Sequence, residues 1–340
     1  MNIVKQKWIF LNSTLVVVPK QVKKLYIFGI QTLALRRIES LRANARLMNL
    51  NWHTAKSKAY RLTNNDHLLP VFKKLLAYQR LIGPKDIIAV DFSDFGNDLQ
   101  VLMFAKQTRK GRTIPVYFEI LKYPIQKDSQ NTFIIQAIIH LQQIVGFKPK
   151  LVFDRGFACP SIIEYLAQNH WIFYIRIKGG KTVIYRKLKQ KAQDLAAGMY
   201  QVKAYDRELS LTITPAPQDL KGKAQQPWYI ISNDLISSAQ TVTRIYYHRF
   251  EIEEFFKDAK RYLGLEYINL QKELSLTIAL WFVILGLWFV WDLEQKILAN
   301  DDYEKQQREQ RQLSIVRYLY EKLWSEIILA AEGEYLNNTG

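Results

Sequence analysis

The stretch "YYHRFEIEEFFKDAK" (Tyr246–Lys260) presents two chemically different faces if it forms one helix. An α-helix turns by about 100° per residue, which places four polar side chains in a stripe roughly 60° wide. Those residues are Tyr246, Arg249, Glu253 and Lys260. An apolar stripe, displaced by about 80°, is formed by Ile245, Ile252, Phe256, Ala259 and Leu263. The stretch predicts a helix that buries one face and borders a cleft with the other. The alternative is a surface helix with an i,i+4 Arg249–Glu253 pair.

Upstream of this helix, apolar runs rich in β-forming residues alternate with helical patterns. The predicted order is three strands, a helix, a strand, a helix and a strand. The stretches are "DIIAVDF" (86–92), "LQVLMFA" (99–105), "IPVYFEIL" (114–121), "NTFIIQAIIHLQQIV" (131–145), "KLVFD" (150–154), "PSIIEYLAQ" (160–168) and "WIFYIRIK" (171–178). This order predicts an α/β fold.

The segment 179–225 is more polar, and its candidate strands are "TVIYRKL", "MYQVKAY" and "ELSLTITPAP". We interpret it as a β-rich insertion. The run "WYIIS" (228–232) then returns to the main sheet, and the helix of Glu253 follows. The predicted domains are a helical domain at 1–80, a core at 81–178 and 226–300, the insertion at 179–225, and a helical tail at 301–340.

Positive charge is concentrated at the N-terminus. The chain has 340 residues and a formal net charge of +17, and residues 1–80 hold fifteen Lys/Arg and two Asp/Glu, leaving only +4 elsewhere. The stretches "TLALRRIESLRANARLM" (32–48) and "WHTAKSKAYRL" (52–62) predict two helices about a tight turn, with Asn51 as N-cap of the second. This is a helix-turn-helix pattern, and Lys56, Lys58 and Arg61 are its candidate DNA contacts.

Several classes of protein lack support. Cys159 is the single cysteine, so no disulfide can form within the chain, which fits the cytoplasm. Five scattered histidines cannot form a zinc cluster with it, and the sequence has no P-loop or GxGxxG stretch. The run "LSLTIALWFVILGLWFVW" (274–291) is barely long enough for a membrane span. We expect a buried helix there, and a membrane protein is the alternative.

Two aspartates come at the ends of buried strands. Asp91 follows "IIAV" and Asp154 follows "LVF". A carboxylate at a strand end either starts a turn or serves a crevice at the sheet edge. With Glu253 they make three carboxylates, a donor set suited to two Mg²⁺ ions for phosphodiester cleavage. Asp94, two residues beyond the expected strand end, is a weaker first ligand.

The spacing Tyr-x2-Arg-x3-Glu-x6-Lys at Tyr246, Arg249, Glu253 and Lys260 resembles the motif of bacterial insertion-sequence DDE transposases, in the family numbered four. The stretches "AVDFSD" and "LVFDRGF" resemble that family's two aspartate strands. The resemblance covers residues 86–265. It implies a ribonuclease H-like mixed-sheet core with a β-rich insertion, an N-terminal all-helical DNA-binding domain and a helical C-terminus.

The same resemblance implies roles for particular residues. Asp91, Asp154 and Glu253 would hold two Mg²⁺ ions, which Mn²⁺ can replace. Tyr246, Arg249 and Lys260 would grip DNA phosphates. Trp228 is a candidate to stack on a flipped base.

The expected activity is cut-and-paste transposition of an insertion sequence by strand hydrolysis and strand transfer. The partners would be double-stranded DNA, as terminal inverted repeats and target, and a second copy of the chain. The alternatives are a ribonuclease H-like nuclease or resolvase without strand joining, and an inactive transposase-derived DNA-binding repressor.

Overall fold

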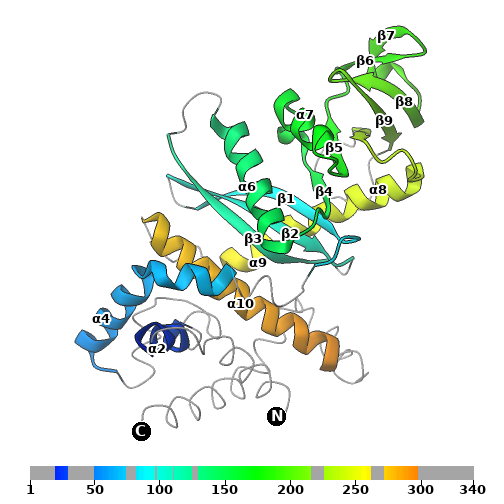
Figure 1. Cartoon of the computed structure of the whole chain (residues 1–340). Helices are drawn as coiled ribbons and strands as arrows, with labels where there is room; N and C mark the ends of the chain where they lie inside the picture. The colour runs from blue at the N-terminus through cyan, green and yellow to red at the C-terminus, as the bar shows by residue number, and fades with distance from the viewer. Residues whose placement is uncertain are drawn as a thin grey trace. The chain divides into compact units, whose positions relative to one another are not determined.

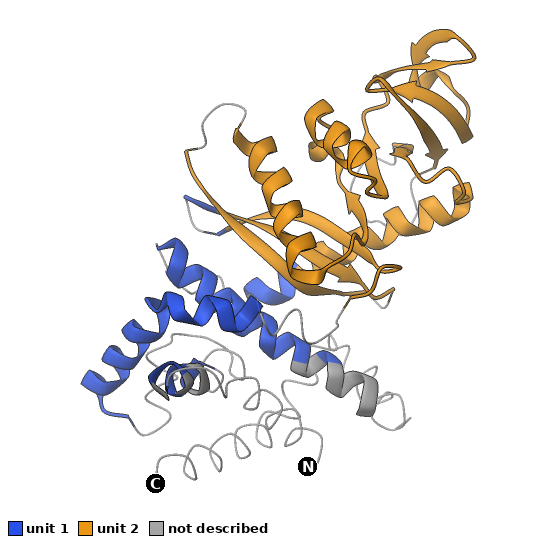
Figure 2. Cartoon of the chain, in the orientation of Figure 1, with its two compact units in different colours: residues 1–79, 95–99, 256–340 blue, residues 80–94, 100–255 orange. Residues whose placement is uncertain are grey.

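The computed structural model describes eight segments of the chain, at residues 20–29, 50–73, 82–95, 98–109, 111–124, 129–215, 226–261 and 272–297 (Figure 1). The chain divides into two compact units (Figure 2). Unit 1 is formed by residues 1–79, 95–99 and 256–340, and unit 2 by residues 80–94 and 100–255.

One ten-stranded sheet organises unit 2. Its spatial order is β3-β2-β1-β4-β5-β10-β9-β8-β6-β7. The strands are β1 (Ile87–Phe95), β2 (Leu99–Gln107), β3 (Thr113–Lys122), β4 (Lys150–Phe153), β5 (Phe173–Ile177), β6 (Thr182–Tyr185), β7 (Leu188–Lys191), β8 (Gly198–Ala204), β9 (Arg207–Thr214) and β10 (Trp228–Ser232). Residues Phe95–Leu99, where β1 ends and β2 begins, are grouped with unit 1.

The first five strands confirm the order predicted from the sequence. β4 pairs in parallel with both β1 and β5. The crossovers contain α6 (Ser129–Val145) before β4 and α7 (Pro160–Gln168) between β4 and β5. In Figure 1, α6 lies in front of β1–β3. Because β4 is buried along almost its whole length, it needs cover on both faces, as parallel strands usually do. This mixed α/β sheet fits a ribonuclease H-like core.

The segment between β5 and β10 continues the same sheet with antiparallel strands. β10 pairs with β5 on one side and with β9 on the other. β9 pairs with β8, β8 with β6, and β6 with β7. The strands expected at "MYQVKAY" and "ELSLTITPAP" are β8 and β9, and "TVIYRKL" folds into the hairpin β6–β7. The predicted return of "WYIIS" to the main sheet is also confirmed.

The prediction of one continuous helix at 246–260 is wrong. The structure has α8 (Ala239–Tyr247), a 3₁₀ turn η5 (His248–Phe250) and α9 (Glu251–Arg261). A 3₁₀ turn has about 3.0 residues per turn instead of 3.6, so the wheel drawn for an unbroken α-helix does not hold across Arg249. The apolar stripe survives, since Ile245, Ile252, Phe256 and Ala259 are buried. Leu263 lies outside the described residues.

Unit 1 is helical in its described part. It contains α2 (Lys20–Gly29), α4 (Trp52–Thr63), η2 (Asp66–Leu68) and α10 (Glu273–Ile297). Asn51 caps α4 as predicted, because its side chain accepts a hydrogen bond from the Thr54 amide at 2.8 Å. The first helix of the expected helix-turn-helix, at 32–48, lies outside the described residues.

The apolar run in α10 packs inside unit 1. The Ser275 hydroxyl donates to the carbonyl of Thr63, at the end of α4, at 2.9 Å. The Phe72 ring stacks on Trp281 at 5.5 Å and meets Phe282 edge-on at 5.0 Å. Across the described segments, no helix has the length and apolar character needed to cross a membrane.

A close approach between α2 and α10 yields a first prediction, for Gly29→Ala. A Cβ atom at Gly29 would lie 2.2 Å from the Phe282 ring, which is fully buried. We expect the substitution to lower the free energy of unfolding by about 1–3 kcal/mol, because overpacking strains a filled core. Chemical denaturation measures it. Gly180→Ala is the control, since its Cβ would meet no atom within 4 Å. Equal stability of the two variants would contradict this close packing.

Candidate active site

Asp91 in β1 and Asp154, which directly follows β4, lie side by side at two neighbouring parallel strands. Val90 of β1 is in register with Phe153 of β4, and each aspartate is the next residue along its chain. Neighbouring strands are about 4.8 Å apart, and residues in register point to the same face. The Asp154 side chain caps the 3₁₀ turn η3 (Arg155–Phe157) by accepting from the Gly156 amide at 2.7 Å. The sheet therefore brings the two predicted aspartates together.

Asp94 does not join them. The expected end of the first strand at Phe92 is wrong, since β1 runs on to Phe95 and includes Asp94. Asp94 is three residues from Asp91 in the same strand, so its side chain points to the opposite face. It is exposed and accepts from Gln100 Nε2 at 2.9 Å. Asp91 is the better candidate on geometric grounds.

Arg249 connects Asp91 to Glu253. Its Nη1 lies 3.0 Å from Asp91 Oδ2, and its Nη2 lies 3.0 Å from Glu253 Oε1. The Arg249 side chain is only 6% exposed, and its guanidinium lies over the Phe250 ring, 4.4 Å from the ring centroid. The i,i+4 Arg249–Glu253 pair anticipated for a surface helix is therefore present, but it is buried and shared with the sheet. One side chain holds the start of α9 to β1.

The three carboxylates are coupled electrostatically through Asp91. Burial raises the pKa of Asp91 to about 6, and the charges of Asp154 and Glu253 act in the same direction while Arg249 lowers it. Burial alone would lower the pKa of Arg249, but Tyr246, Asp91 and Glu253 raise it above its ordinary value. Three carboxylates thus surround one bridging cation, which leaves the cluster with excess negative charge.

The excess negative charge of these carboxylates raises the question of whether they suit a metal ion. In the described part of the chain, no group of three acidic, His or Cys side chains is arranged to hold a metal ion. The donors nevertheless fit in kind, because carboxylate oxygens are the preferred ligands of Mg²⁺. The incompletely neutralised charge around Asp91 also favours a further cation. Asp91, Asp154 and Glu253 are the residues that would hold it.

Glu251, which was not predicted from the sequence, positions the helix that carries Glu253. Its buried carboxylate accepts from three backbone amides in the turn between β2 and β3, those of Thr108 at 3.1 Å, Arg109 at 3.3 Å and Gly111 at 3.1 Å. Its Oε1 also lies 2.9 Å from His248 Nδ1. The start of α9 is thereby fixed to the sheet. In the sequence, the concentration of glutamates at 251–254 was the signal that could have indicated this role.

Arg176 was not predicted either. Phe153 of β4 is in register with Ile175 of β5, so Arg176 is level with Asp154 across the sheet. It is a lone half-buried charge in a strand whose other residues are buried and uncharged, which was its sequence signal. Burial raises the pKa of the Tyr246 hydroxyl, whereas Arg249 and Arg176 lower it. Arg176 thus adds a second positive charge near the carboxylates.

Tyr246 and Trp228 are buried together. Tyr246 is 1% exposed and Trp228 is 3% exposed, so Tyr246 does not border an open cleft as the helical wheel predicted. Their ring centroids are 4.9 Å apart, and Phe250 stacks on Trp228 at 5.7 Å. A DNA base would reach Trp228 only if this ring cluster opened. The packing of Trp228 therefore gives no support to its predicted role in base stacking.

The remaining predicted DNA contacts belong to unit 1. Lys56 and Arg61 are exposed on α4, while Lys58 is half-buried with its Nζ 5.6 Å from the centroid of the Phe28 ring. Lys260 is half-buried, and its Nζ lies 5.1 Å from the centroid of the Phe95 ring. Lys56 and Arg61 are therefore the more accessible of these four cations.

The raised pKa of Asp91 yields a second prediction. The carboxyl ionises near pH 4 in the unfolded chain but only near pH 6 in the folded, metal-free protein. Its contribution to stability is therefore complete below about pH 4 and lost as the pH rises through 6. The shift corresponds to about 3 kcal/mol. We expect wild type to lose about 3 kcal/mol more than Asp91→Asn between pH 4 and pH 8, measured by denaturation in EDTA. Parallel pH profiles would rule this out.

A third prediction concerns Arg249. Arg249→Met leaves the buried carboxylates without their bridging cation, so the free energy of unfolding should fall by about 3–5 kcal/mol at pH 8. The free energy of unfolding of Arg249→Lys should lie between those of wild type and Arg249→Met, because an ammonium lacks the planar fork that reaches both carboxylates. The control is Arg207→Met, which removes a partly exposed pair with Glu164 at 3.8 Å and should cost about 1 kcal/mol or less. If both Met variants were equally stable, Arg249 would not bridge these carboxylates.

Comparison with known proteins identifies the family. Two of the solved structures with detectable similarity are of Argonaute from Aquifex aeolicus, both at 14% identity, with TM-scores of 0.25 and 0.28. The matches cover 55% and 62% of this chain and 29% and 35% of the two Argonaute chains, so this chain spans about a third of their length. At these TM-scores the similarity supports no conclusion about fold or function. No curated protein matches the sequence. The family model described as "Transposase DDE domain" matches residues 119–289, half of the chain, including Asp154 and Glu253. The chain belongs to the transposase DDE domain family.

Proposed function

We propose that the chain catalyses cut-and-paste transposition of an insertion sequence. The observation that carries this proposal is the carboxylate cluster, in which Asp91 and Asp154 are level on parallel strands and Arg249 joins Asp91 to Glu253. Its substrate would be the double-stranded DNA at the inverted repeats of the element. The spacing of Tyr246, Arg249, Glu253 and Lys260 supports the assignment to the family-four type.

In this proposal Asp91, Asp154 and Glu253 hold two Mg²⁺ ions. The bound ions would activate a water and stabilise the leaving oxygen of the phosphodiester. The protein contributes position: β1 and β4 fix the two aspartates, and Glu251 fixes the start of α9. Burial around Asp91 excludes water and strengthens every charge interaction there.

In this proposal, positively charged side chains beside the carboxylates bind the phosphates of the DNA. Arg249 can present two parallel donors to a phosphate, but it must first exchange one of its carboxylate partners. Arg176 is level with Asp154 and is an additional cation on the sheet. Lys56 and Arg61 on α4 are exposed and would bind the repeat outside the cleavage site. Pairing two ends of the element implies that two copies act together.

The decisive experiment, and the fourth prediction, separates binding from cleavage and joining. Duplexes carrying the inverted repeats that flank the gene are incubated with Mg²⁺ and a target plasmid. Asp91→Ala, Asp154→Ala and Glu253→Ala should each lower cleavage by about 10³-fold or more while the affinity for DNA stays within about twofold. Asp94→Ala is the matched control and should cleave at close to the wild-type rate.

The products distinguish the alternatives. Joining of the cleaved 3′ end to the plasmid is expected of a transposase. Cleavage without joining would identify a nuclease or resolvase, and binding without cleavage by wild type would identify a repressor. Normal cleavage by any one of the three Ala variants would remove that residue from the site.

A further inference from the structure

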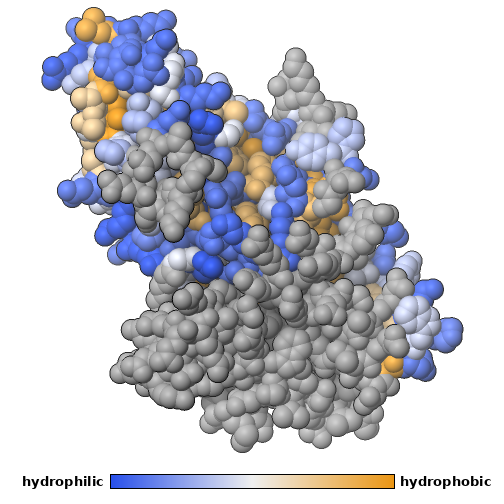
Figure 3. All heavy atoms as spheres, turned by 180° about the vertical axis from the view of Figure 1, so that it is seen from behind, coloured by the Kyte–Doolittle hydropathy of each residue, from blue (hydrophilic) through white to orange (hydrophobic). Residues whose placement is uncertain are grey.

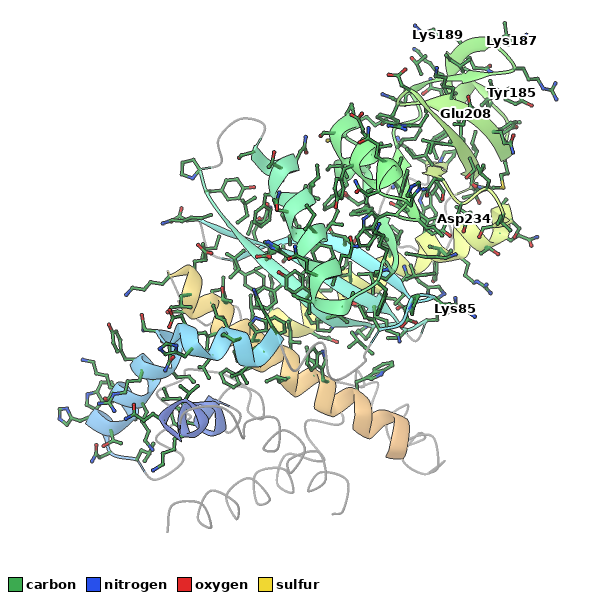
Figure 4. All side chains as sticks on the ribbon, in the orientation of Figure 1. Lys85, Tyr185, Lys187, Lys189, Glu208 and Asp234 are labelled. Carbon is green, nitrogen blue, oxygen red and sulfur yellow. The ribbon has the colours of Figure 1, made fainter. Side chains whose placement is uncertain are left out.

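The hairpin β6–β7 is a strongly basic part of unit 2. Residues 178–191 contain six Lys/Arg and no Asp/Glu. The six are Lys178, Lys181, Arg186, Lys187, Lys189 and Lys191. Five of them, all but the half-buried Lys181, are exposed, and β7 is the edge strand of the sheet. Figure 4 shows Lys187 and Lys189 extending away from the ribbon at this end of the unit.

The strand lysines gather on one face. Lys189 of β7 is in register with Ile184 of β6, which is in turn in register with Lys203 of β8. Lys191 is two residues from Lys189 and so shares its face. Glu208, opposite Lys203, is the acidic member of this row. Within the described segments, no ion pair engages Lys189, Lys191 or Lys203.

The turn of the hairpin has two basic residues at positions where its backbone conformation disfavours them. Arg186 and Lys187 are the two residues between the paired ends Tyr185 and Leu188, and their φ values are +47° and +68°. Positive φ at both positions defines a type I′ turn, where Asn and Gly are strongly favoured. Long basic side chains at such positions indicate a role outside folding.

We propose that the β6–β7 hairpin is a second DNA-binding surface, which places its basic turn in a groove of duplex DNA and its strand lysines against the phosphates. A two-stranded ribbon fits the major groove, and exposed lysines without carboxylate partners release counterions on binding phosphates. The inference rests on the proposed function, because the same unit carries the carboxylate cluster.

The sheet order sets where this contact falls. β7 stands seven positions from β1, which carries Asp91. At about 4.8 Å per strand the two strands are separated by about 34 Å across the sheet. One turn of B-DNA is about 34 Å long. The hairpin should therefore protect DNA within about ten base pairs of the cleaved bond.

An anionic membrane is the less suitable partner. Membrane-surface elements present a continuous apolar face beside their cations. Leu188 is in register with Tyr185, the neighbour of Ile184, so the exposed apolar side chains Ile184 and Leu188 lie on opposite faces of the hairpin. The surface over β6–β9 is mainly hydrophilic, with a smaller hydrophobic strip (Figure 3).

The test, and the fifth prediction, replaces the turn by the residues that its geometry prefers. Arg186→Asn with Lys187→Gly should keep or raise the thermal midpoint, because Asn-Gly suits a type I′ turn. The same variant should bind a repeat-end duplex about tenfold more weakly in EDTA, and the slope of log affinity against log salt should fall by about two. Footprinting should show lost protection within about ten base pairs of the cleavage point.

The control removes the same charge elsewhere in unit 2. Lys85→Asn with Lys122→Asn replaces two exposed lysines outside the hairpin and should leave affinity within about twofold and the footprint unchanged. Equal affinity and footprint of the turn variant and this control would overturn the inference. Loss of binding to anionic vesicles in the turn variant, with unchanged DNA affinity, would assign the hairpin to a membrane and also overturn it. Absence of cleavage by wild type would count against the proposed function alone.

Discussion

The site depends on one buried guanidinium. Arg249 contacts a carboxylate on the sheet and another on α9, and it is almost fully shielded from water. Like charges this close repel strongly in a medium of low dielectric constant, so the aspartates and Glu253 can share the site only with a cation among them. The backbone follows from this requirement, because the 3₁₀ turn His248–Phe250 places Arg249 between its two partners.

Two further carboxylates fix the frame around this centre. Glu251 ties the start of α9 to the turn after β2 through backbone amides. Asp234, labelled in Figure 4, follows β10 and accepts hydrogen bonds from Tyr174 at 2.6 Å, Lys150 at 3.2 Å and Ser237 at 2.8 Å. Burial opposes ionisation of Asp234, but these hydrogen bonds lower its pKa below the usual range. The charges of Glu251 and Asp234 are thus offset by hydrogen-bond donors of the protein itself.

Local sequence was enough to predict the helices and strands but not the tertiary contacts between them. The strands of the core and the helix Pro160–Gln168 follow from apolar runs and their turn residues, which act over a few positions. The break at Arg249 is accompanied by contacts with distant residues, such as the hydrogen bond of Glu251 to a turn more than a hundred residues away, which no helical wheel contains. Tyr246 packs against Trp228, which is distant in the sequence. The position of Arg176 beside Asp154 depends on the register between β4 and β5. Asp91 and Asp154 were predicted because each follows a buried apolar run, and Glu253 because of its spacing from Tyr246 and Arg249. The link that Arg249 makes between Asp91 and Glu253 required the fold.

The continuity of the ten-stranded sheet limits how the β6–β7 hairpin can change in evolution. Its strands keep their lysines on one face because successive side chains alternate. Inserting one residue into each strand would move every lysine to the opposite face, whereas inserting two would keep the face and extend the tip by about 6–7 Å. Insertions and deletions among relatives should therefore come in pairs here. The reach of the hairpin along its partner would vary in steps of that size, roughly two base pairs each, at about 3.4 Å per base pair.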